Sequence, residues 1–512
     1  MATGYSAGGA LAAPGRIAPM LASNRKRLRG VAKMLKRKTL AALGLAAAAL
    51  AFAGVAMTAS SNDDELLKDE KHFLEQSNKT YEGGQKGIQI SPNLEVVAHD
   101  SLGDRGFNGD VWAHKGYAYV GHWGFQDWAS GSKNRFCPEA PKSGVAVVKV
   151  DAAGATRVST LQNPAGTSAE DVVVYTADDG RDIAAAGIQW CGGPRDDPDA
   201  EHGLMLWDVS NPASPSQLGY LKTACCTRGV HEFEVERHAN GHTYAYATVP
   251  TSRYPDSTTQ SGYRDENGDG DFRLIDITDP ASPTQVSDWG FQDAGGPWTA
   301  GQGCDPDPNY GHGAEPSEDG TAVFLSYWDS GFIKLDLSNP SAPVFLGRTV
   351  YPADADGDAH SSNYDDARQL LFTADEDFCP HSGPATEVGW GYLRVYDYAD
   401  PAAPEQLGVF KTQNSLAIGD PAAGDYTIHN PFVVGTDVYT SWYSDGVRIV
   451  DASDPSNMHE VGYFVPPAGQ NPVKPPQRGV LSQAAQVWGV VVEDGLIYAS
   501  DMNTGLWVLR RK

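Results

Sequence analysis

Short runs in which apolar and polar residues alternate recur along the chain from about residue 90 to its last residues. In residues 331–347 and 391–408, such a run ends at an aspartate, and an Asn-Pro or Asp-Pro pair follows three residues later. A period of two predicts a strand with one buried face. The short carboxylate or amide side chain can bond to nearby backbone N–H groups and proline fixes φ, so the pair predicts a tight turn. Each unit therefore predicts a strand, a tight turn and another strand.

This unit repeats along most of the chain, and its marker aspartate returns every 54 to 68 residues, with an arginine at the last place. Upstream of each marker lies another pair of apolar runs around a tight turn, as in residues 111–121 and 431–441. A unit that cannot bury its own apolar face has to stack on its neighbours. The pattern thus predicts an all-β, seven-bladed β-propeller of four-stranded antiparallel blades over residues 90–512. The markers are Asp151, Asp208, Asp276, Asp336, Asp397, Asp451 and Arg510.

The two ends of the repeat region complement each other. The last unit stops at Leu509 after its third strand, and residues 91–103 are similar to the outer strand that it lacks. We therefore expect the N-terminal strand to complete the last blade, because a ring joined in this way leaves no exposed sheet edge at the seam.

The repeated pattern Gly-Leu-x-(Ile/Val/Leu)-x-Asp-x-(Ser/Thr)-(Asp/Asn)-Pro resembles the LVIVD repeat of bacterial and archaeal secreted or cell-surface propellers. The resemblance covers essentially all of residues 90–510. It departs from the pattern in the first unit, which lacks the Asn/Asp-Pro pair, and in the last, where Arg510 replaces the aspartate. The resemblance implies a propeller outside the cytoplasm, and it implies no reaction, since members of that family mostly lack an assigned activity.

A basic stretch and a long apolar run precede the repeats. Residues 34–38 carry three basic side chains, and residues 40–57 are apolar without interruption. Followed by small residues, this order is typical of a secretory signal peptide, although the run is also long enough for an uncleaved membrane anchor. We expect cleavage, with Met34 as a candidate start. Residues 1–60 are thus expected to form the leader and residues 61–89 a polar spacer.

Charge is distributed unevenly along the 512 residues. Residues 1–60 contain nine Lys or Arg and no acidic residue, whereas the remainder carries 65 Asp or Glu. Such an acidic surface repels nucleic-acid phosphates and anionic membranes. We therefore expect no nucleic-acid partner, contact with a membrane only through an uncleaved leader, and a preference for cations.

Insertions fall between the second and third strands of the units and between one unit and the next, and both loop classes emerge on the same face of a propeller. Function concentrates on loops that a rigid scaffold carries, so this face is expected to bind an unidentified protein or glycan. Exposed aromatic residues such as Trp123, Trp128 and Trp298 are the reason for including a glycan among the expected ligands.

Because an exported chain lies in an oxidising compartment, its cysteines predict up to three disulfides, with thiolate metal ligation as the alternative. All six lie in these loops: Cys137, Cys191, Cys225, Cys226, Cys304 and Cys379.

Two acidic loops predict Ca²⁺ sites. Residues 265–271 read Asp-Glu-Asn-Gly-Asp-Gly-Asp, which has the alternating oxygen ligands and central glycine of a calcium loop. Position 12 of that loop would be Asp276, a strand residue, so flanking helices are not expected. The expected ligands are Asp265, Asn267, Asp269 and Asp271 in this loop and Asp354, Asp356 and Asp358 in a second, weaker candidate.

Histidines coincide with the predicted starts of the innermost strands, which line the channel of a propeller. Four of the 13 histidines fall at equivalent positions in successive units, so their imidazoles can converge on Fe, Cu or Zn. Glu232, Asp171 and Glu315 are close enough in sequence to support them. The layout is similar to that of carotenoid-cleaving oxygenases, propellers with iron on four axial histidines, without a shared motif; a polar, water-filled channel is the alternative. The equivalent positions are Gly109, Glu170, His231, His312, His360, His429 and Trp488.

The sequence contains no HExxH, CxxC, P-loop or dinucleotide-binding motif. We therefore expect an exported or cell-surface propeller that acts as a binding or scaffold module, with calcium-stabilised loops on one face. Whether it is an enzyme stays open, and no catalytic residue is assigned. The alternative function is a metal-dependent oxidoreductase or hydrolase that uses the four channel histidines.

Overall fold

Strands account for nearly all regular structure in the part of the chain that the computed structural model describes. The two helices there are short, namely η1 (Phe291–Ala294) and α2 (Gln413–Leu416). Among these residues, no helix is long and apolar enough to cross a membrane. The predicted leader and residues 61–86 of the predicted spacer lie outside the described residues. The structure describes residues 87–126, 135–191, 201–224, 227–250, 264–265, 267–296, 310–351, 357–378, 389–416, 424–469 and 484–512.

Most strands form antiparallel groups of four in which sequence neighbours pair. The first two groups are joined by a single bridge between His122 and Ala169. They comprise β3 (Asn108–His114), β4 (Tyr117–His122), β7 (Val145–Asp151) and β8 (Gly154–Leu161), and then β9 (Thr167–Thr176), β10 (Asp182–Trp190), β11 (Gly203–Asp208) and β12 (Ser216–Lys222).

Three further groups form separate four-stranded sheets with the same strand order. These are β13 (Phe233–Arg237), β14 (Thr243–Thr248), β15 (Phe272–Asp276) and β16 (Thr284–Trp289); β17 (Gly313–Pro316), β18 (Ala322–Ser326), β19 (Phe332–Asp336) and β20 (Val344–Arg348); and β21 (Ala359–Asp365), β22 (Leu370–Asp375), β23 (Leu393–Asp397) and β24 (Glu405–Phe410). A two-stranded ribbon, β5 (Phe125–Gln126) and β6 (Arg135–Phe136), stands apart from them.

The last two groups combine strands from both ends of the described chain. β2 pairs with β31, which is the pairing that the sequence predicts for the N-terminal strand, and β1 pairs with β28. The strands are β25 (Pro431–Val434), β26 (Asp437–Trp442), β27 (Gly446–Asp451) and β28 (His459–Val465) with β1 (Gln89–Ile90), and β29 (Val487–Glu493), β30 (Leu496–Asp501) and β31 (Gly505–Arg511) with β2 (Leu94–Asp100).

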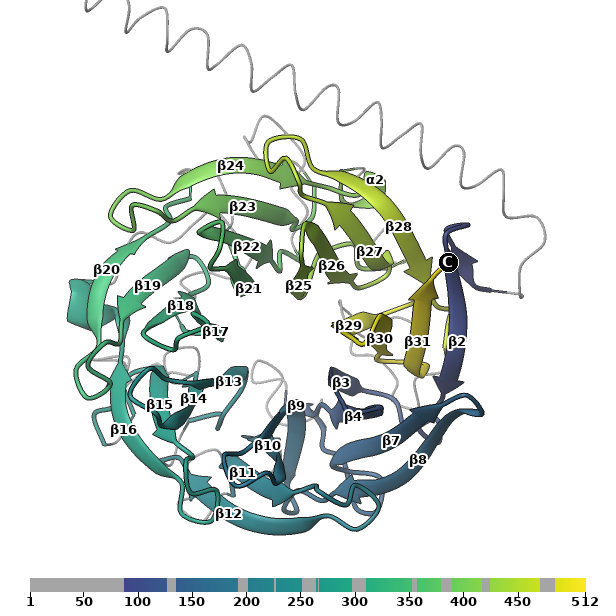
Figure 1. Cartoon of the computed structure of the whole chain (residues 1–512), viewed down its shortest axis with the longest axis horizontal. Coiled ribbons are helices and arrows are strands. Elements are labelled where there is room, and N and C mark those ends of the chain that lie inside the picture. The colour runs from purple at the N-terminus through teal and green to yellow at the C-terminus, as the bar shows by residue number, and fades with distance from the viewer. Residues whose placement is uncertain are drawn as a thin grey trace, which may run out of the picture. The chain divides into compact units, whose positions relative to one another are not determined.

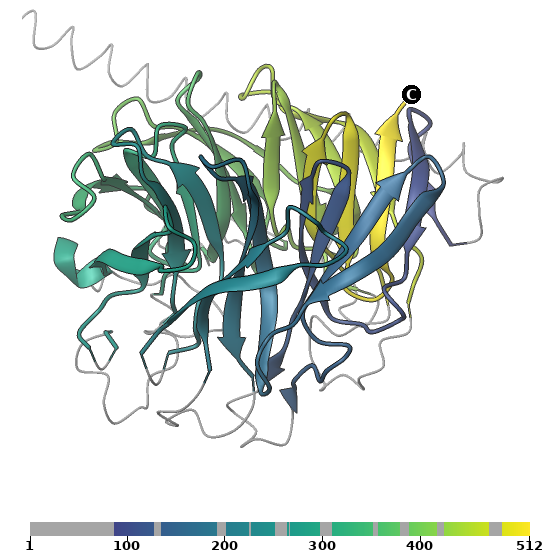
Figure 2. The same cartoon turned by 60° about the horizontal axis from the view of Figure 1, so that its bottom comes forward.

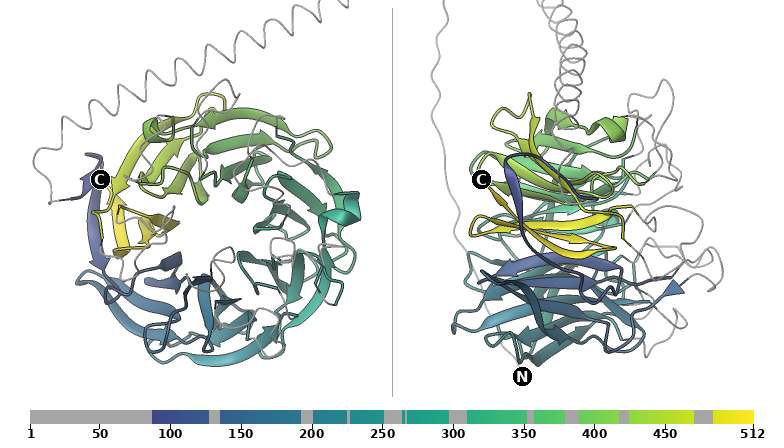
Figure 3. Two further views of the ribbon diagram at one scale, coloured as in Figure 1. Left: turned by 180° about the vertical axis from the view of Figure 1, so that it is seen from behind. Right: turned by 90° about the vertical axis from the view of Figure 1, so that its right-hand side faces the viewer.

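The groups stand side by side around a central axis, each with its first strand innermost (Figure 1). Each first strand contacts the first strand of the next group, and β29 contacts β3. Figure 2 and the view from behind in Figure 3 show the same radial arrangement. Buried apolar side chains fill the space between adjacent sheets, as where Tyr246 and Leu274 pack with Val323 and Leu335. The prediction of an all-β, propeller-like fold of four-stranded antiparallel sheets is confirmed.

The marker aspartates accept hydrogen bonds from backbone N–H groups two residues later, a role that the sequence did not predict for them. Oδ1 of Asp208 accepts the N–H of Ser210 at 2.9 Å, and Oδ1 of Asp336 accepts the N–H of Ser338 at 2.7 Å. The Asn-Pro and Asp-Pro pairs add a second turn bond, since Oδ1 of Asp400 accepts the N–H two residues later. The repeated residues therefore end the third strand and form the turn that leads to the fourth strand.

Candidate metal centre

The four predicted histidines lie next to one another at the starts of the first strands. His312 directly precedes β17 and His360 lies in β21, whereas one residue separates His231 from β13 and His429 from β25. Taken in this order, successive ring centroids are 4.2, 4.0 and 4.1 Å apart. Each of the four side chains is buried. The repeat register therefore brought together residues that are 48 to 81 positions apart in the sequence.

The remaining predicted positions flank this row of rings. The Trp488 ring lies 4.4 Å from that of His429 and ends the row on one side. Glu170 lies at the other side, and a Cβ on Gly109 would come within 2.7 Å of the Glu170 carbonyl oxygen. The close approach of β3 to β9 therefore requires glycine at position 109.

Glu232 joins two of the histidines in a first donor set. Its Oε2 lies 3.6 Å from His312 Nδ1 and its Oε1 lies 3.5 Å from His360 Nε2. One atom from each of the three residues lies within 4.8 Å of the others. Glu232 is 7% exposed, and its Oε1 accepts no hydrogen bond from the described residues.

Glu376 joins His360 to His429 in a second donor set. Its Oε2 lies 3.5 Å from His360 Nε2, and its Oε1 lies 3.9 Å from His429 Nε2. The hydroxyl of the buried Tyr443 donates a hydrogen bond to Glu376 Oε1 and so orients the carboxylate. The two sets share His360, and each contains two imidazoles and one carboxylate.

A backbone bond fixes the tautomer of His360. Its Nδ1 lies 3.1 Å from the carbonyl oxygen of His429, and because a carbonyl only accepts, Nδ1 carries the proton. The lone pair of Nε2 then faces both glutamates. This is the state in which metal-binding histidines are held, with one nitrogen bonded to the protein and the other directed at the ion.

His231 lies outside both donor sets and contacts His312 instead. The two Nε2 atoms are 2.7 Å apart, and His231 Nδ1 lies 3.0 Å from Glu170 Oε2. The side-chain amide of Gln189 donates to the same Glu170 oxygen. A proton on His231 Nδ1, directed at Glu170, would leave His231 Nε2 as the acceptor, so that His312 would donate from Nε2 and direct its Nδ1 lone pair toward Glu232. In this arrangement His231 and Glu170 would orient His312, which belongs to the first donor set.

Burial sets the charge states of the centre. It lowers the pKa of His429 to about 3, and burial followed by the neighbouring histidines lowers the pKa of His360 well below its usual range. Burial, followed by repulsion from Asp110 and Asp171, raises the pKa of Glu232 well above its usual range. Neutral imidazoles close to buried carboxylates are the ligand set of a divalent first-row cation. Such a cation would stabilise the ionised form of Glu232.

Two of the three carboxylates that were predicted to support the histidines lie outside the two donor sets. Asp171 accepts the backbone N–H groups of Val172 and Phe233, and Glu315 accepts donors from Asn363 and Tyr364. The third, Glu232, belongs to a donor set.

Glu376 was not predicted from the sequence, because it follows β22, the second strand of its sheet, whereas the predicted positions lie at the starts of first strands. The antiparallel pairing of the two strands could have located this residue, because in a hairpin the end of the second strand lies opposite the start of the first. Ala359 pairs with Asp375 in this way, and the N–H of Glu376 donates to the carbonyl of Asp358.

The predicted calcium loop directs its side chains to protein partners. Asp265 forms an ion pair of 2.9 Å with Arg273, and both side chains are 1% exposed. Asp269 accepts from the Gln285 side chain and Asp271 from the Tyr327 hydroxyl. The Arg273 guanidinium thus supplies positive charge to this loop, and Ca²⁺ binding there stays a prediction.

The other loop predictions fall largely on residues that are not described. Asp354 and Asp356 lie outside the described residues, and Asp358 precedes β21 with its carbonyl oxygen bonded to Glu376. The sulfur atoms of Cys137 and Cys191 lie at bonding distance, with the Cα atoms 5.3 Å apart. Also outside the described residues are Cys225, Cys226, Cys304, Cys379, Trp128 and Trp298.

Comparison with known proteins agrees with the repeat. The LVIVD repeat family matches residues 199–223, 323–350 and 438–465. These segments cover β11 with β12, β18 to β20, and β26 to β28. No curated protein matches the chain.

Solved structures match over most of the chain at low similarity. A catalytically inactive virginiamycin B lyase from Staphylococcus aureus, solved with quinupristin, is 9% identical with a TM-score of 0.44, covering 82% of this chain and 99% of that one. A chain of the mitotic checkpoint complex is 8% identical with a TM-score of 0.44, covering 84% and 95%. The computationally designed protein Ika8 is 8% identical with a TM-score of 0.42, covering 81% and 98%. Similarity this low carries no inference about function.

Proposed function

We propose that this LVIVD-repeat protein is an exported propeller that holds a divalent transition metal on its axis and provides it as a reactive centre. The observation that carries the proposal is the convergence of His312, His360 and His429 with Glu232 and Glu376, at distances of 3.5 to 3.9 Å between facing atoms. Ligands bonded to one first-row metal at about 2.1 Å lie roughly this far apart.

The proposed architecture is a ring of seven blades. Its support is the strand grouping, the contact of each first strand with the next, and the contact of β29 with β3. The pairing of β2 with β31 would close the ring, as the LVIVD pattern led us to expect. A closed ring matters for the site because donors from four sheets must keep fixed positions relative to one another.

The donor chemistry narrows the choice of metal. Two imidazoles and one carboxylate with open positions are typical of non-haem Fe(II) sites, and His₂Glu sets also hold catalytic Zn²⁺. We propose iron or zinc. Such an ion supplies Lewis-acid chemistry, and iron in addition supplies redox chemistry.

The residues around the donors have separate roles in this proposal. His231 and Glu170 hold His312 in the tautomer that directs Nδ1 toward Glu232, and Tyr443 orients Glu376. The burial of the donors excludes water from all but the open positions, which strengthens electrostatic interactions at the site.

Export is part of the proposal. It is supported by the leader pattern of residues 34–60, by the LVIVD repeats, and by the proximity of Cys137 to Cys191, since disulfides persist in oxidising compartments.

A binding module without chemistry is the second candidate function. The observation that favours it is a cavity next to Glu232 whose walls carry eight carboxylates.

The metal content of a matched pair of variants tests the main proposal. His360 is shared by both donor sets, so His360→Gln should lower bound iron or zinc at least tenfold, measured by elemental mass spectrometry on the full chain exported to an oxidising compartment. His238→Gln is the control, because His238 is equally buried but bonds only to backbone groups. Wild-type protein that binds neither metal, or equal metal content in His360→Gln and wild type, would overturn the proposal.

A further inference from the structure

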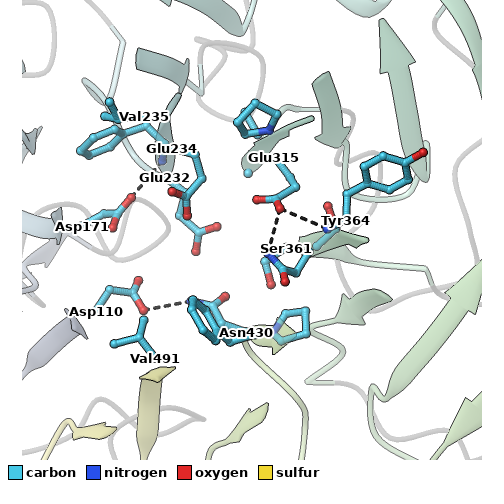
Figure 4. Close-up of a pocket in the computed structure, with 18 of the residues that line it drawn as sticks. Asp110, Asp171, Glu232, Glu234, Val235, Glu315, Ser361, Tyr364, Asn430 and Val491 are labelled. Carbon is cyan, nitrogen blue, oxygen red and sulfur yellow. Dashed lines mark hydrogen bonds between the residues drawn. The ribbon is translucent and has the colours of Figure 1, made fainter. Parts of the chain in front are cut away.

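An acidic cavity of about 320 Å³ lies beside the candidate metal centre, further along the first strands (Figure 4). Among the described residues that line it there is no Lys or Arg. A volume of this size corresponds to about ten water molecules, which is enough for a small organic ligand. Its eight carboxylates belong to Asp110, Asp171, Glu232, Glu234, Glu236, Glu315, Glu318 and Asp366.

Strand β13 connects the cavity to the metal centre. Alternate residues of a strand project to the same side, so Glu232, Glu234 and Glu236 form a row of carboxylates along the cavity. Glu232 is the innermost and also faces His312 and His360. It is 7% exposed, its Oε1 accepts no hydrogen bond from the described residues, and its carboxylate points into the cavity in Figure 4.

Part of the cavity wall is apolar. Val111, Trp112, Phe432, Val490 and Val491 line it. A bare metal ion gains nothing from such a wall, whereas an organic cation can bury its hydrocarbon part there and direct its charge at the carboxylates.

The hydrogen bonds inside the cavity orient the carboxylates without neutralising them. Asp110 accepts from the amide of Asn430 at 2.9 Å, and Glu315 accepts from the amide of Asn363 at 2.7 Å. Burial, followed by repulsion from Asp366, raises the pKa of Glu315 to about 8. Burial and mutual repulsion thus favour the protonated form of such carboxyls, and a bound cation would favour their ionised form.

We infer that this cavity binds a small organic cation, a primary ammonium group on an apolar body, and presents it to the metal centre. The presentation step rests on the proposed metal function, whereas the binding of the cation does not. Ammonium donates three hydrogen bonds and suits several converging carboxylates, and its aliphatic part matches the apolar wall.

Calorimetric titration of the full chain with butylammonium and 1,4-diaminobutane tests this inference, with 1-butanol and potassium chloride as controls. We expect saturable binding of both amines and none of the controls. Glu234→Gln and Glu315→Gln should each weaken amine binding about tenfold, because each removes one charged hydrogen-bond partner. Glu95→Gln, which alters an exposed carboxylate paired with Arg510, should leave binding unchanged.

The failures of the two proposals are distinguishable if the metal content of the same samples is measured. Metal-loaded protein that binds neither amine, or that binds 1-butanol as tightly, would overturn the inference and leave the metal function standing. Amine binding to protein that takes up no metal would support the cavity and overturn the metal function. Unchanged amine affinity in both glutamine variants that retain the wild-type melting temperature would also overturn the inference.

Discussion

At the scale of single residues, His360 and His231 have different relations to the candidate metal. His360 directs one nitrogen at both glutamates, whereas His231 reaches His312 with one nitrogen and Glu170 with the other. In the proposed centre, the same residue type at equivalent repeat positions would therefore be a metal donor in one sheet and would orient a donor in another. The difference comes from the neighbours of each ring, and the repeat pattern carries no information on it.

Substitution of His231 separates these two roles. His231→Gln should retain the metal but weaken its affinity about 10- to 100-fold, which is typical for loss of a residue that orients a ligand. His312→Gln should lose the metal more completely, because it removes a donor. Competition with a chelator measures both affinities, with His238→Gln as the control. Equal loss in the two variants would show that His231 is itself a ligand.

Asp265 has a partner in the structure that the calcium pattern does not include. The spacing of residues 265–271 predicts calcium ligands, yet Asp265 faces Arg273, which comes from the following strand β15. Arg273 is one of several buried arginines on third strands that pair with carboxylates, such as Arg394 with Asp375 and Arg448 with Glu460. The pattern of oxygen ligands contains no information on this guanidinium, and calcium binding by the loop stays a prediction.

At the scale of elements, the strands and turns were predictable because their causes are local. Alternation with a period of two and the turn bonds of the Asn-Pro and Asp-Pro pairs need no knowledge of the fold. The row of histidines was predictable as well, since one register applied to every unit places them at strand starts. Glu376 was not predicted, because a register of first-strand starts does not include the end of β22, which pairs with the start of β21.

The N-terminal strand β2 is the element whose contribution is easiest to test. Leu94 is 1% exposed and packs in a core cluster with residues of β27, β29 and β31. Leu94→Ala should lower the free energy of unfolding by about 2 to 5 kcal/mol, the usual cost of such a cavity. Urea denaturation followed by tryptophan fluorescence measures the change.

Val434→Ala is the matched control for this prediction, because Val434 is 43% exposed and also lies in a strand. It should change the free energy of unfolding by less than about 0.5 kcal/mol. An equally small effect of Leu94→Ala would mean that β2 contributes little to the sheet of β29 to β31.

At the scale of the whole molecule, the repeat explains how an unremarkable set of strands builds a site. Each group supplies one strand start to the axis, so side chains from distant parts of the chain meet there. The same geometry leaves the rest of each first strand lining the acidic cavity. The candidate metal centre and the cavity therefore follow from one arrangement, and Glu232 belongs to both.

The most direct test of the metal centre is X-ray absorption at the metal edge of the full chain loaded with iron or zinc. We expect a first coordination shell of nitrogen and oxygen at about 2.0 to 2.2 Å, with the outer-shell scattering of two or three imidazoles and no sulfur. A shell that contains sulfur would indicate that cysteines of the loops bind the metal. A shell of oxygen alone, without imidazole scattering, would contradict the assignment of His312, His360 and His429 as ligands.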